Sequence, residues 1–268
     1  MPGHFGGDVV MFLLDKWYCD VVTDQGSGAI LYAARLRWGP LRVGYAALLC
    51  LADGTAPREQ ATRRHVVLPE LDGDVATWSN RSLHIEGRWW RDAPPVERRL
   101  AEGPDGTIEW MCHMPRARAS VHIGDAQLAG LGYVERLRLS IPPWKLPFRT
   151  LRWGRYLSSR HWLVWIDWDG SHSRRWAWLD GVEQPGAAFS ADGLVGLDED
   201  RQLVHEEGRD IRDQPVLATL RGPLPALARR LAGALERSHE HKRLAHGSIL
   251  QAGRPVDRGW SVYEEVAW

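Results

Sequence analysis

The fold of this chain is indicated by one stretch, GLGYVERLRL at residues 130–139, which is followed by LRWGR at residues 151–155. With the two-residue period of a strand, the apolar side chains of the first stretch share one face with Glu135, while Arg136 and Arg138 share the other. Burying a bare carboxylate costs several kcal/mol, so Glu135 must find partners or stay protonated, and desolvation can raise a glutamate pKa to about 8–9. The stretch therefore predicts a strand that carries one proton donor into the interior.

The rest of the chain consists of short alternating segments separated by turn signals, which is the pattern of antiparallel β structure. Residues 30–38 alternate between apolar and basic side chains and stop at Gly39 and Pro40. Residues 78–90 alternate in the same way and end shortly before two prolines. A Pro-Asp-Gly turn at residues 104–106 joins two further strands. We therefore predict an all-β fold.

Length and composition limit the classes of protein. The chain of 268 residues is long enough for two ordinary domains, and its hydrophobic fraction of 44% supports a full core. The formal charge balances at 34 basic and 34 acidic residues, which removes the long-range field that nucleic-acid binding exploits. We expect no nucleic-acid partner. Three cysteines without close spacing indicate neither a disulfide framework nor a zinc site.

The start of the chain bears on localisation. Its longest apolar run, residues 9–14, is far too short to cross a bilayer. The run also lacks a basic leader and a small-residue cleavage site. We therefore expect a cytoplasmic protein, while the oligomeric state stays open.

Tryptophan is unusually abundant, with 15 residues against 6 tyrosines and 4 phenylalanines. One interpretation is that these rings fill a wide barrel interior through edge-to-face contacts worth about 0.5–1.5 kcal/mol each. The other is an aromatic-lined site, since a desolvated ring face stabilises a positive charge by about 0.5–2 kcal/mol. Both interpretations stay open at this point.

The pattern changes to small residues at 124–132, which we interpret as the junction of two units. The first unit then covers residues 1–126 and the second covers residues 127–268. Within the second unit, residues 224–244 place five leucines near one stripe with arginines elsewhere. This pattern predicts one helix that plugs or flanks the second barrel.

Two further carboxylates share a strand face with apolar residues. Asp167 lies on the face of Leu163 and Trp165, and Glu264 lies on the apolar face of the last strand. Each is a candidate for an inward position. The alternative for each is a structural carboxylate paired with one of the many arginines.

Other motifs of the sequence do not predict a functional site. A His-Glu-His run at residues 239–241 has the composition of a metal site, but on the predicted helix His239 and His241 point to different sides. The chain has neither a Gly-x-Ser-x-Gly elbow nor a Gly-x-Gly-x-x-Gly loop that opens a helix. We therefore predict no metal site, no serine nucleophile and no phosphate loop.

The segment IPPWKLPFR at residues 141–149 combines aromatic, basic and proline residues. Proline removes ladder donors, so we expect a loop or an edge here. Two interpretations remain: a loop that covers the barrel mouth, or a peripheral contact with a membrane surface. The residues of that membrane contact are Trp144, Lys145, Phe148 and Arg149.

The order Gly-x-Gly-Tyr-x-Glu, a gap and Trp-Gly-Arg resembles the core signature of the carotenoid 1,2-hydratase, tocopherol cyclase and AttH-like superfamily. DKWYCD at residues 15–20 is similar to the first strand of that superfamily, which reads Glu-Trp-Trp-Tyr. One departure matters. Hydratases of this group usually continue after the tyrosine with His-Asp-His-Asn-Trp-Gly, whereas residues 134–139 here read VERLRL. The acid remains as Glu135, but its histidine and tryptophan neighbours are absent.

The resemblance implies two lipocalin-like β-barrels and a chemistry that needs no cofactor. Glu135 would protonate a carbon–carbon double bond of a hydrophobic, isoprenoid-like substrate such as a carotenoid. Aromatic rings would stabilise the carbocation, and water or an internal hydroxyl would capture it, which gives hydration or cyclisation. In this scheme Arg155 orients the acid, and Tyr133, Trp153 and Trp165 line the path of the cation. The further substrate-binding candidates are Trp17, Tyr18, Asp167 and Glu264.

Three alternatives to this scheme remain. Relatives with the double-barrel plan also catalyse pericyclic cyclisations of the Diels-Alder type, in which no single acid is indispensable. A non-catalytic carrier of a lipid or pigment is the second alternative, because the residues after Tyr133 differ from the hydratase pattern. In the third, a bidentate pair with Arg155 holds Glu135 ionised and purely structural.

Overall fold

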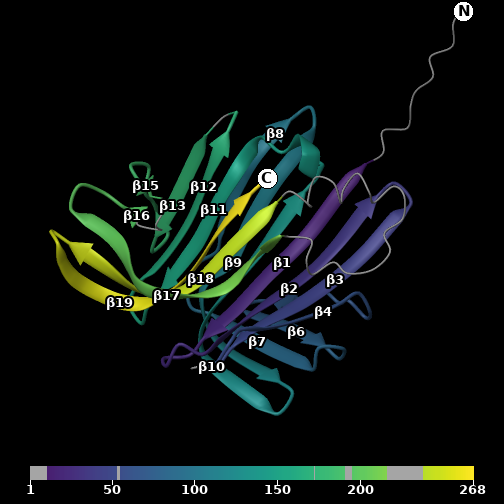
Figure 1. The fold of residues 1–268 in the computed structure, drawn as a ribbon, viewed down its shortest axis with the longest axis horizontal. Helices are drawn as coiled ribbons and strands as arrows, with labels where there is room; N and C mark the ends of the chain where they lie inside the picture. The colour runs from purple at the N-terminus through teal and green to yellow at the C-terminus, as the bar shows by residue number, and fades with distance from the viewer. Residues whose placement is uncertain (1–10, 53–54, 172, 191–194, 216–237) are drawn as a thin grey trace, which may run out of the picture.

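The computed structural model describes residues 11–52, 55–171, 173–190, 195–215 and 238–268. Their backbone forms two large, curled antiparallel sheets that lie side by side (Figure 1). The prediction of an all-β fold is confirmed.

The first sheet contains β1 (Phe12–Val22), β2 (Gly28–Trp38), β3 (Leu41–Leu51), β4 (Arg58–Thr62), β5 (Glu70–Asp72), β6 (Val75–Asn80), β7 (Ile85–Arg91), β8 (Val96–Gly103), β9 (Gly106–Ile123) and β10 (Ala126–Leu139). A short 3-10 helix, η1 (Pro143–Lys145), follows. The second sheet contains β11 (Phe148–Leu157), β12 (Trp162–Gly170), β13 (Arg174–Leu179), β14 (Val182–Glu183), β15 (Ala188–Phe189), β16 (Val195–Gly196), β17 (Arg201–Pro215), β18 (His239–Gln251) and β19 (Arg254–Ala267).

The two sheets share one strand order. The first runs β4-β3-β2-β1-β10-β9-β7-β6-β5, with β8 paired to β9, and the second runs β14-β13-β12-β11-β19-β18-β17-β16-β15. In each sheet the first long strand pairs with the last, β1 with β10 and β11 with β19. The chain therefore repeats one antiparallel plan twice, which agrees with the expected pair of lipocalin-like barrels.

The chain changes sheets between Leu139 and Phe148. Strand β10 pairs with β1 on one side and β9 on the other, so it closes the first sheet. The strand that starts near Tyr133, which the sequence pattern placed in the second unit, belongs to the first sheet. Small residues at 130 and 132 mark a close approach rather than a junction, because a side chain on Gly130 or Gly132 would collide with the β1 backbone.

The predicted helix at residues 224–244 is wrong where the structure describes it. Residues 239–244 lie in β18, which pairs with β17 and β19 along its length. Residues 224–237 lie outside the described part of the chain. Pairing on both sides outweighs the helical leucine spacing, since each strand residue gains cross-strand contacts that an isolated helix lacks.

Three hydrophobic clusters form the core. One contains residues of the first sheet only, and includes Trp17 and Trp89. Another contains residues of the second half only, and includes Tyr156 and Trp165. The third combines both sheets, and Tyr18 and many tryptophans belong to it. We call this third cluster the inter-sheet layer. Each curled sheet thus buries one face in its own cluster and packs the other against its neighbour.

Candidate active site

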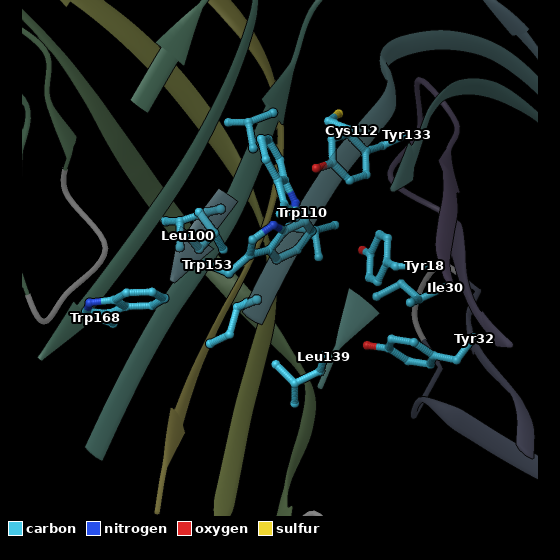
Figure 2. Close-up of a cluster of buried hydrophobic side chains, with 14 of the residues drawn as sticks. Tyr18, Ile30, Tyr32, Leu100, Trp110, Cys112, Tyr133, Leu139, Trp153 and Trp168 are labelled. Carbon is cyan, nitrogen blue, oxygen red and sulfur yellow. The ribbon is translucent and has the colours of Figure 1, made fainter. Parts of the chain in front are cut away.

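Glu135 points into the inter-sheet layer, as predicted. Its Oε2 accepts hydrogen bonds from Trp110 Nε1 at 2.5 Å, from the Tyr133 hydroxyl at 2.7 Å and from Trp153 Nε1 at 3.2 Å. Trp110 comes from β9 and Trp153 from β11, so both sheets contribute donors. The expected proximity of Trp153 to Glu135 is confirmed. Figure 2 shows Trp110 and Trp153 next to each other, with Tyr18, Tyr32 and Tyr133 directed toward them.

All three donors bind the same oxygen of the Glu135 carboxyl group, Oε2. Trp110 and Trp153 can only donate, so Oε2 must accept from both. No donor among the described residues reaches Oε1. When the Glu135 carboxyl is neutral, its proton therefore sits on Oε1, the oxygen that accepts no hydrogen bond from the described residues.

Burial raises the pKa of Glu135 above its usual value. The hydrogen bonds from Trp110, Tyr133 and Trp153 act in the opposite direction, as does the positive charge of Lys16, but desolvation has the larger effect. The result is a carboxyl group that keeps its proton at higher pH than a solvated glutamate does. This is the electrostatic condition for a general acid.

Aromatic rings surround the carboxyl group. The Trp153 ring lies 4.9 Å from that of Tyr18 and 5.6 Å from that of Tyr133, measured between centroids. Trp110 stacks on Trp178 of the second sheet at 5.1 Å. These rings exclude water and present π faces, which stabilise a nearby positive charge.

The site is built from two facing rows of cross-strand neighbours. Residues directly opposite each other on paired strands point to the same face, so each row presents four side chains to the other sheet. The rows are Ala47, Tyr32, Tyr18 and Glu135 in the first sheet, and Trp153, Glu264, Lys242 and Arg212 in the second.

Lys242 is fully buried in the middle of the second row. It forms ion pairs with Glu264, across the strand pair, and with Glu240 at 3.2 Å. Its ammonium lies 5.7 Å from the ring centres of Tyr18 and Tyr32. Burial lowers the pKa of Lys242 to about 8, although Glu240 works against the shift. The inward position predicted for Glu264 is confirmed, with a lysine rather than an arginine as its partner.

Sequence reasoning missed Lys242 because it assigned residues 224–244 to a helix. Strand alternation would have placed Glu240, Lys242 and Leu244 on one face, which is the arrangement in β18. Arg212 completes this polar group. It pairs with Glu240 at 2.9 Å and also with Glu59 of the first sheet.

The predicted partner of Arg155 is wrong. Arg155 Nε donates to Asp20 Oδ2 at 2.9 Å, and both side chains are fully buried. The Tyr18 hydroxyl donates to the same oxygen, and Arg155 Nη1 donates to the Trp260 carbonyl. Arg155 therefore joins the two sheets through Asp20, and no arginine of the described residues pairs with Glu135. Alternation within DKWYCD puts Asp20 on the face of Tyr18, a signal that could have identified it.

Three predicted substrate-binding residues lie on other faces. Trp17 stacks on His113 at 5.0 Å within the first-sheet cluster, and Trp165 belongs to the second-half cluster. Asp167 is held by Arg152 and Arg175, each at 3.1 Å. All three stand on strand faces directed away from Glu135, because successive side chains alternate. Tyr18, Tyr133, Trp153 and Glu264 lie in the inter-sheet layer as expected.

The loop before β11 packs inward. Trp144 contacts Trp38 at 5.0 Å, Phe148 stacks on Trp168 at 5.0 Å, and Lys145 pairs with Asp105 at 2.5 Å. The rings of this segment thus cover one end of the inter-sheet layer. Membrane contact through Trp144, Lys145, Phe148 and Arg149 stays a prediction, and the inward rings do not support it.

The histidines of the His-Glu-His run share one face of β18, contrary to the helical expectation. His241 Nε2 lies 2.8 Å from Asp210, and His239 Nε2 lies 3.4 Å from Asp213. Within the described residues, no three histidine, cysteine or acidic side chains converge as a metal site would require.

Among the described residues, no helix has the length and apolar character needed to span a bilayer.

Three solved structures share this fold over nearly the whole chain. An AttH-like protein from Nitrosomonas europaea aligns with a TM-score of 0.57 at 12% identity, covering 100% of this chain and 97% of that one. CghA, crystallised with Sch210972, aligns at 0.58 and 14% identity, covering 96% and 88%. Kievitone hydratase from Nectria haematococca aligns at 0.52 and 11% identity, covering 97% and 89%.

No family model matches the sequence, and no curated protein matches it at the level of sequence. The likeness to solved structures therefore establishes the fold: this chain shares the two-sheet, lipocalin-like architecture of these three proteins. Fold alone does not assign an activity, which must come from the residues of the site.

Proposed function

We propose that the protein catalyses a cofactor-independent, acid-initiated hydration or cyclisation of a hydrophobic substrate, with Glu135 as the proton donor. The arrangement of donors on Glu135 carries this proposal. Trp110, Tyr133 and Trp153 all bind Oε2, which leaves Oε1 without a donor among the described residues and so able to carry the transferable proton. A carboxyl group held in one orientation, with a raised pKa, is suited to protonate a carbon–carbon double bond.

The proposed steps balance without a cofactor. The proton on Oε1 is transferred to one alkene carbon, and the π electrons form the new C–H bond. The adjacent carbon becomes a carbocation that faces the rings of Trp110, Trp153 and Tyr133. Water or an internal hydroxyl then adds to the cation and releases its proton, which restores the Glu135 carboxyl group. Water gives a hydrated product, and an internal hydroxyl gives a ring.

The comparisons support this class of reaction in a general way. One protein of the same fold is a hydratase by name, and another was crystallised with the small molecule Sch210972. An isoprenoid or carotenoid substrate stays a prediction from the sequence resemblance. The predicted roles change for Arg155, which holds Asp20, whereas Tyr133 and Trp153 keep their places beside the acid.

The test is a reaction in D2O with a panel of polyenes, prenylated phenols and unsaturated acids, followed by mass spectrometry of the products. Acid initiation places one non-exchanging deuterium on carbon. A pericyclic cyclisation yields an isomer without deuterium, and a carrier returns the compound unchanged. General acid catalysis contributes about 10²–10⁴-fold, so Glu135→Gln should lose at least about a hundredfold in turnover.

The matched control is Glu109→Gln, a glutamate of β9 that forms only long contacts with Arg99 and Arg138. Turnover of the control should equal that of the wild type. If Glu135→Gln kept the wild-type rate on a substrate that incorporates deuterium, Glu135 would not be the acid.

A further inference from the structure

Lysine is rare in this chain, and its positions are informative. Only three of the 34 basic residues are lysines, at positions 16, 145 and 242. Lys145 pairs with Asp105 at the surface, whereas Lys16 and Lys242 both point into the inter-sheet layer. Arginine occupies every other basic position. The two inward lysines therefore place a compact ammonium in the inter-sheet layer, and an arginine there would bind a ligand differently, since lysine and arginine are not interchangeable at a binding site.

Lys16 differs from the other cations of the layer because it has no ion-pair partner among the described residues. Lys242 pairs with Glu264, Arg212 with Glu240, and Arg155 with Asp20. The Lys16 ammonium lies 4.9 Å over the Tyr32 ring and forms no hydrogen bond with another described residue. The residue is partly buried, and desolvation lowers the pKa of its ammonium.

The surroundings of Lys16 are apolar at close range and charged farther out. In its own cross-strand row it stands between Ala34 and Leu137, with Tyr45 beyond Ala34. Leu14, Leu36, Tyr45 and Leu137 are partly buried and pack at the edge of the inter-sheet layer. The charged groups that act on Lys16 are Glu135, Glu240 and Arg212, and Lys242 is influenced by Lys16 in turn.

We infer that Lys16 binds the ionised carboxyl group of an apolar substrate, and that this contact favours the protonated form of Glu135. The second part rests on the proposed function. One ammonium near Glu135 and Glu240 suits a single negative charge, because a dianion such as a phosphate would be repelled more strongly by these carboxylates. The leucines at the rim would contact the hydrocarbon part, which would run from Lys16 toward Glu135 and Trp153.

The coupling to Glu135 follows from electrostatics. The free Lys16 ammonium favours ionised Glu135, which opposes its function as an acid. A bound carboxylate neutralises that ammonium, so the pKa of Glu135 rises further and more of its carboxyl groups take up a proton from solvent. Substrate binding would thus prepare the donor, and water alone in the site would leave it less reactive.

The experiment compares three probes with the same chain: dodecanoic acid, dodecanol and dodecyl phosphate. Binding is measured by tryptophan fluorescence and by calorimetry. A charge-assisted contact should make dodecanoate bind about tenfold more tightly than dodecanol. Lys16→Met should remove that preference, and Lys16→Arg should restore part of it. Lys145→Met is the matched control and should bind like the wild type.

Proton uptake is measured by calorimetry in two buffers that differ in ionisation enthalpy. Dodecanoate binding should take up protons in the wild type, and the part missing in Glu135→Gln belongs to Glu135. Equal affinity for dodecanoate and dodecanol, or tighter binding of dodecyl phosphate, would overturn the assignment of Lys16. Uptake that is unchanged in Glu135→Gln would overturn the coupling. A carboxylate preference that persists in Glu135→Gln, with no deuterium incorporated by the wild type, would keep the anion site and reject the acid.

Site-resolved labelling keeps the inference testable if Lys16→Met folds poorly. Reductive methylation with 13C-formaldehyde gives one signal for each of the three lysines in addition to the N-terminus. Dodecanoate should shift the Lys16 signal and leave that of Lys145 in place. A Lys16 signal that is unmoved at saturating dodecanoate would contradict direct contact.

Discussion

Trp153 of the second sheet donates its indole N–H to Glu135 of the first at 3.2 Å, so the candidate acid is completed only when the two sheets pack together. Two residues after Trp153, the same strand carries Arg155, which binds Asp20 of β1. One face of β11 therefore both joins the sheets, through Arg155, and sets the environment of the acid, through Trp153. A change at Arg155 should mainly alter stability, and a change at Trp153 should mainly alter the chemistry.

Trp153→Phe should move the pH dependence of the reaction upward. The substitution keeps an aromatic ring but removes one donor that favours ionised Glu135. The pKa of Glu135 should then rise further, so the loss of kcat/KM on the alkaline side should occur at higher pH. Trp178→Phe is the control, because its ring stacks on Trp110 and all three donors to Glu135 remain. Identical alkaline limbs in the wild type and Trp153→Phe would show that this hydrogen bond does not tune the acid.

Glu135→Gln should become increasingly stable, relative to the wild type, as pH rises. Burial raises the folded-state pKa of Glu135 above 4.5, so the folded protein holds this proton more tightly than the unfolded chain. The free energy of unfolding of the wild type therefore falls as pH rises from about 4 through the folded pKa. Glutamine cannot ionise and escapes this loss. Urea denaturation of both proteins from about pH 4 to about pH 8 measures the difference.

The stability difference also tests the structural alternative for Glu135. A carboxylate that stabilises the fold through an ion pair would make Glu135→Gln less stable at neutral pH, by roughly 3–5 kcal/mol. Parallel stability curves for the wild type and Glu135→Gln would mean that the folded pKa of Glu135 is not raised.

The Asp20–Arg155 pair should be strongly coupled. Both side chains are fully buried, so removing one partner leaves an uncompensated charge. We expect Asp20→Asn and Arg155→Met each to lower the free energy of unfolding by about 3–5 kcal/mol. The double variant should lose less than the sum of the two, because it leaves no unpaired charge. Additive losses in chemical denaturation would show that the pair does not join the sheets energetically.

His113 should contribute to acid sensitivity. Burial next to Arg136, against the Trp17 ring, lowers its pKa from 6.5 to about 4. The folded state thus prefers neutral His113, and stability should be lost as pH falls from 6.5 toward 4. His113→Phe should reduce this loss in thermal unfolding. An unchanged acid limb in His113→Phe would place the sensitivity elsewhere.

Alternation along the chain determined much of the site. It placed Glu135 and Tyr133 on one face of a strand, and it placed Glu264 inward in the last strand, because side chains alternate wherever a strand forms. The motif Trp-Gly-Arg also led to Trp153. Its glycine has a steric reason: a side chain on Gly154 would collide with the ring of Trp165 on the neighbouring strand.

Only the tertiary structure decided which apolar face meets the other sheet. In β1 both faces are buried, so Trp17 and Tyr18 look equally suitable in sequence, yet Tyr18 alone reaches Glu135's layer. In the same way, the sequence could not show that Trp153 lies in the layer of Glu135 and that Trp165 lies in another cluster. A two-residue period identifies faces, but it cannot say which face packs inside its own sheet and which against a partner.

Partners across the sheets were equally beyond the sequence. Arg155 met Asp20 rather than Glu135, because this pair joins strands separated by many residues and depends on how two curled surfaces fit. The leucine spacing near residue 240 favoured a helix, and pairing with β17 and β19 overrode it. The sequence by itself determined strands, faces and the inward acid, whereas the packing of the sheets decided its donors, its neighbouring charges and the position of Lys16.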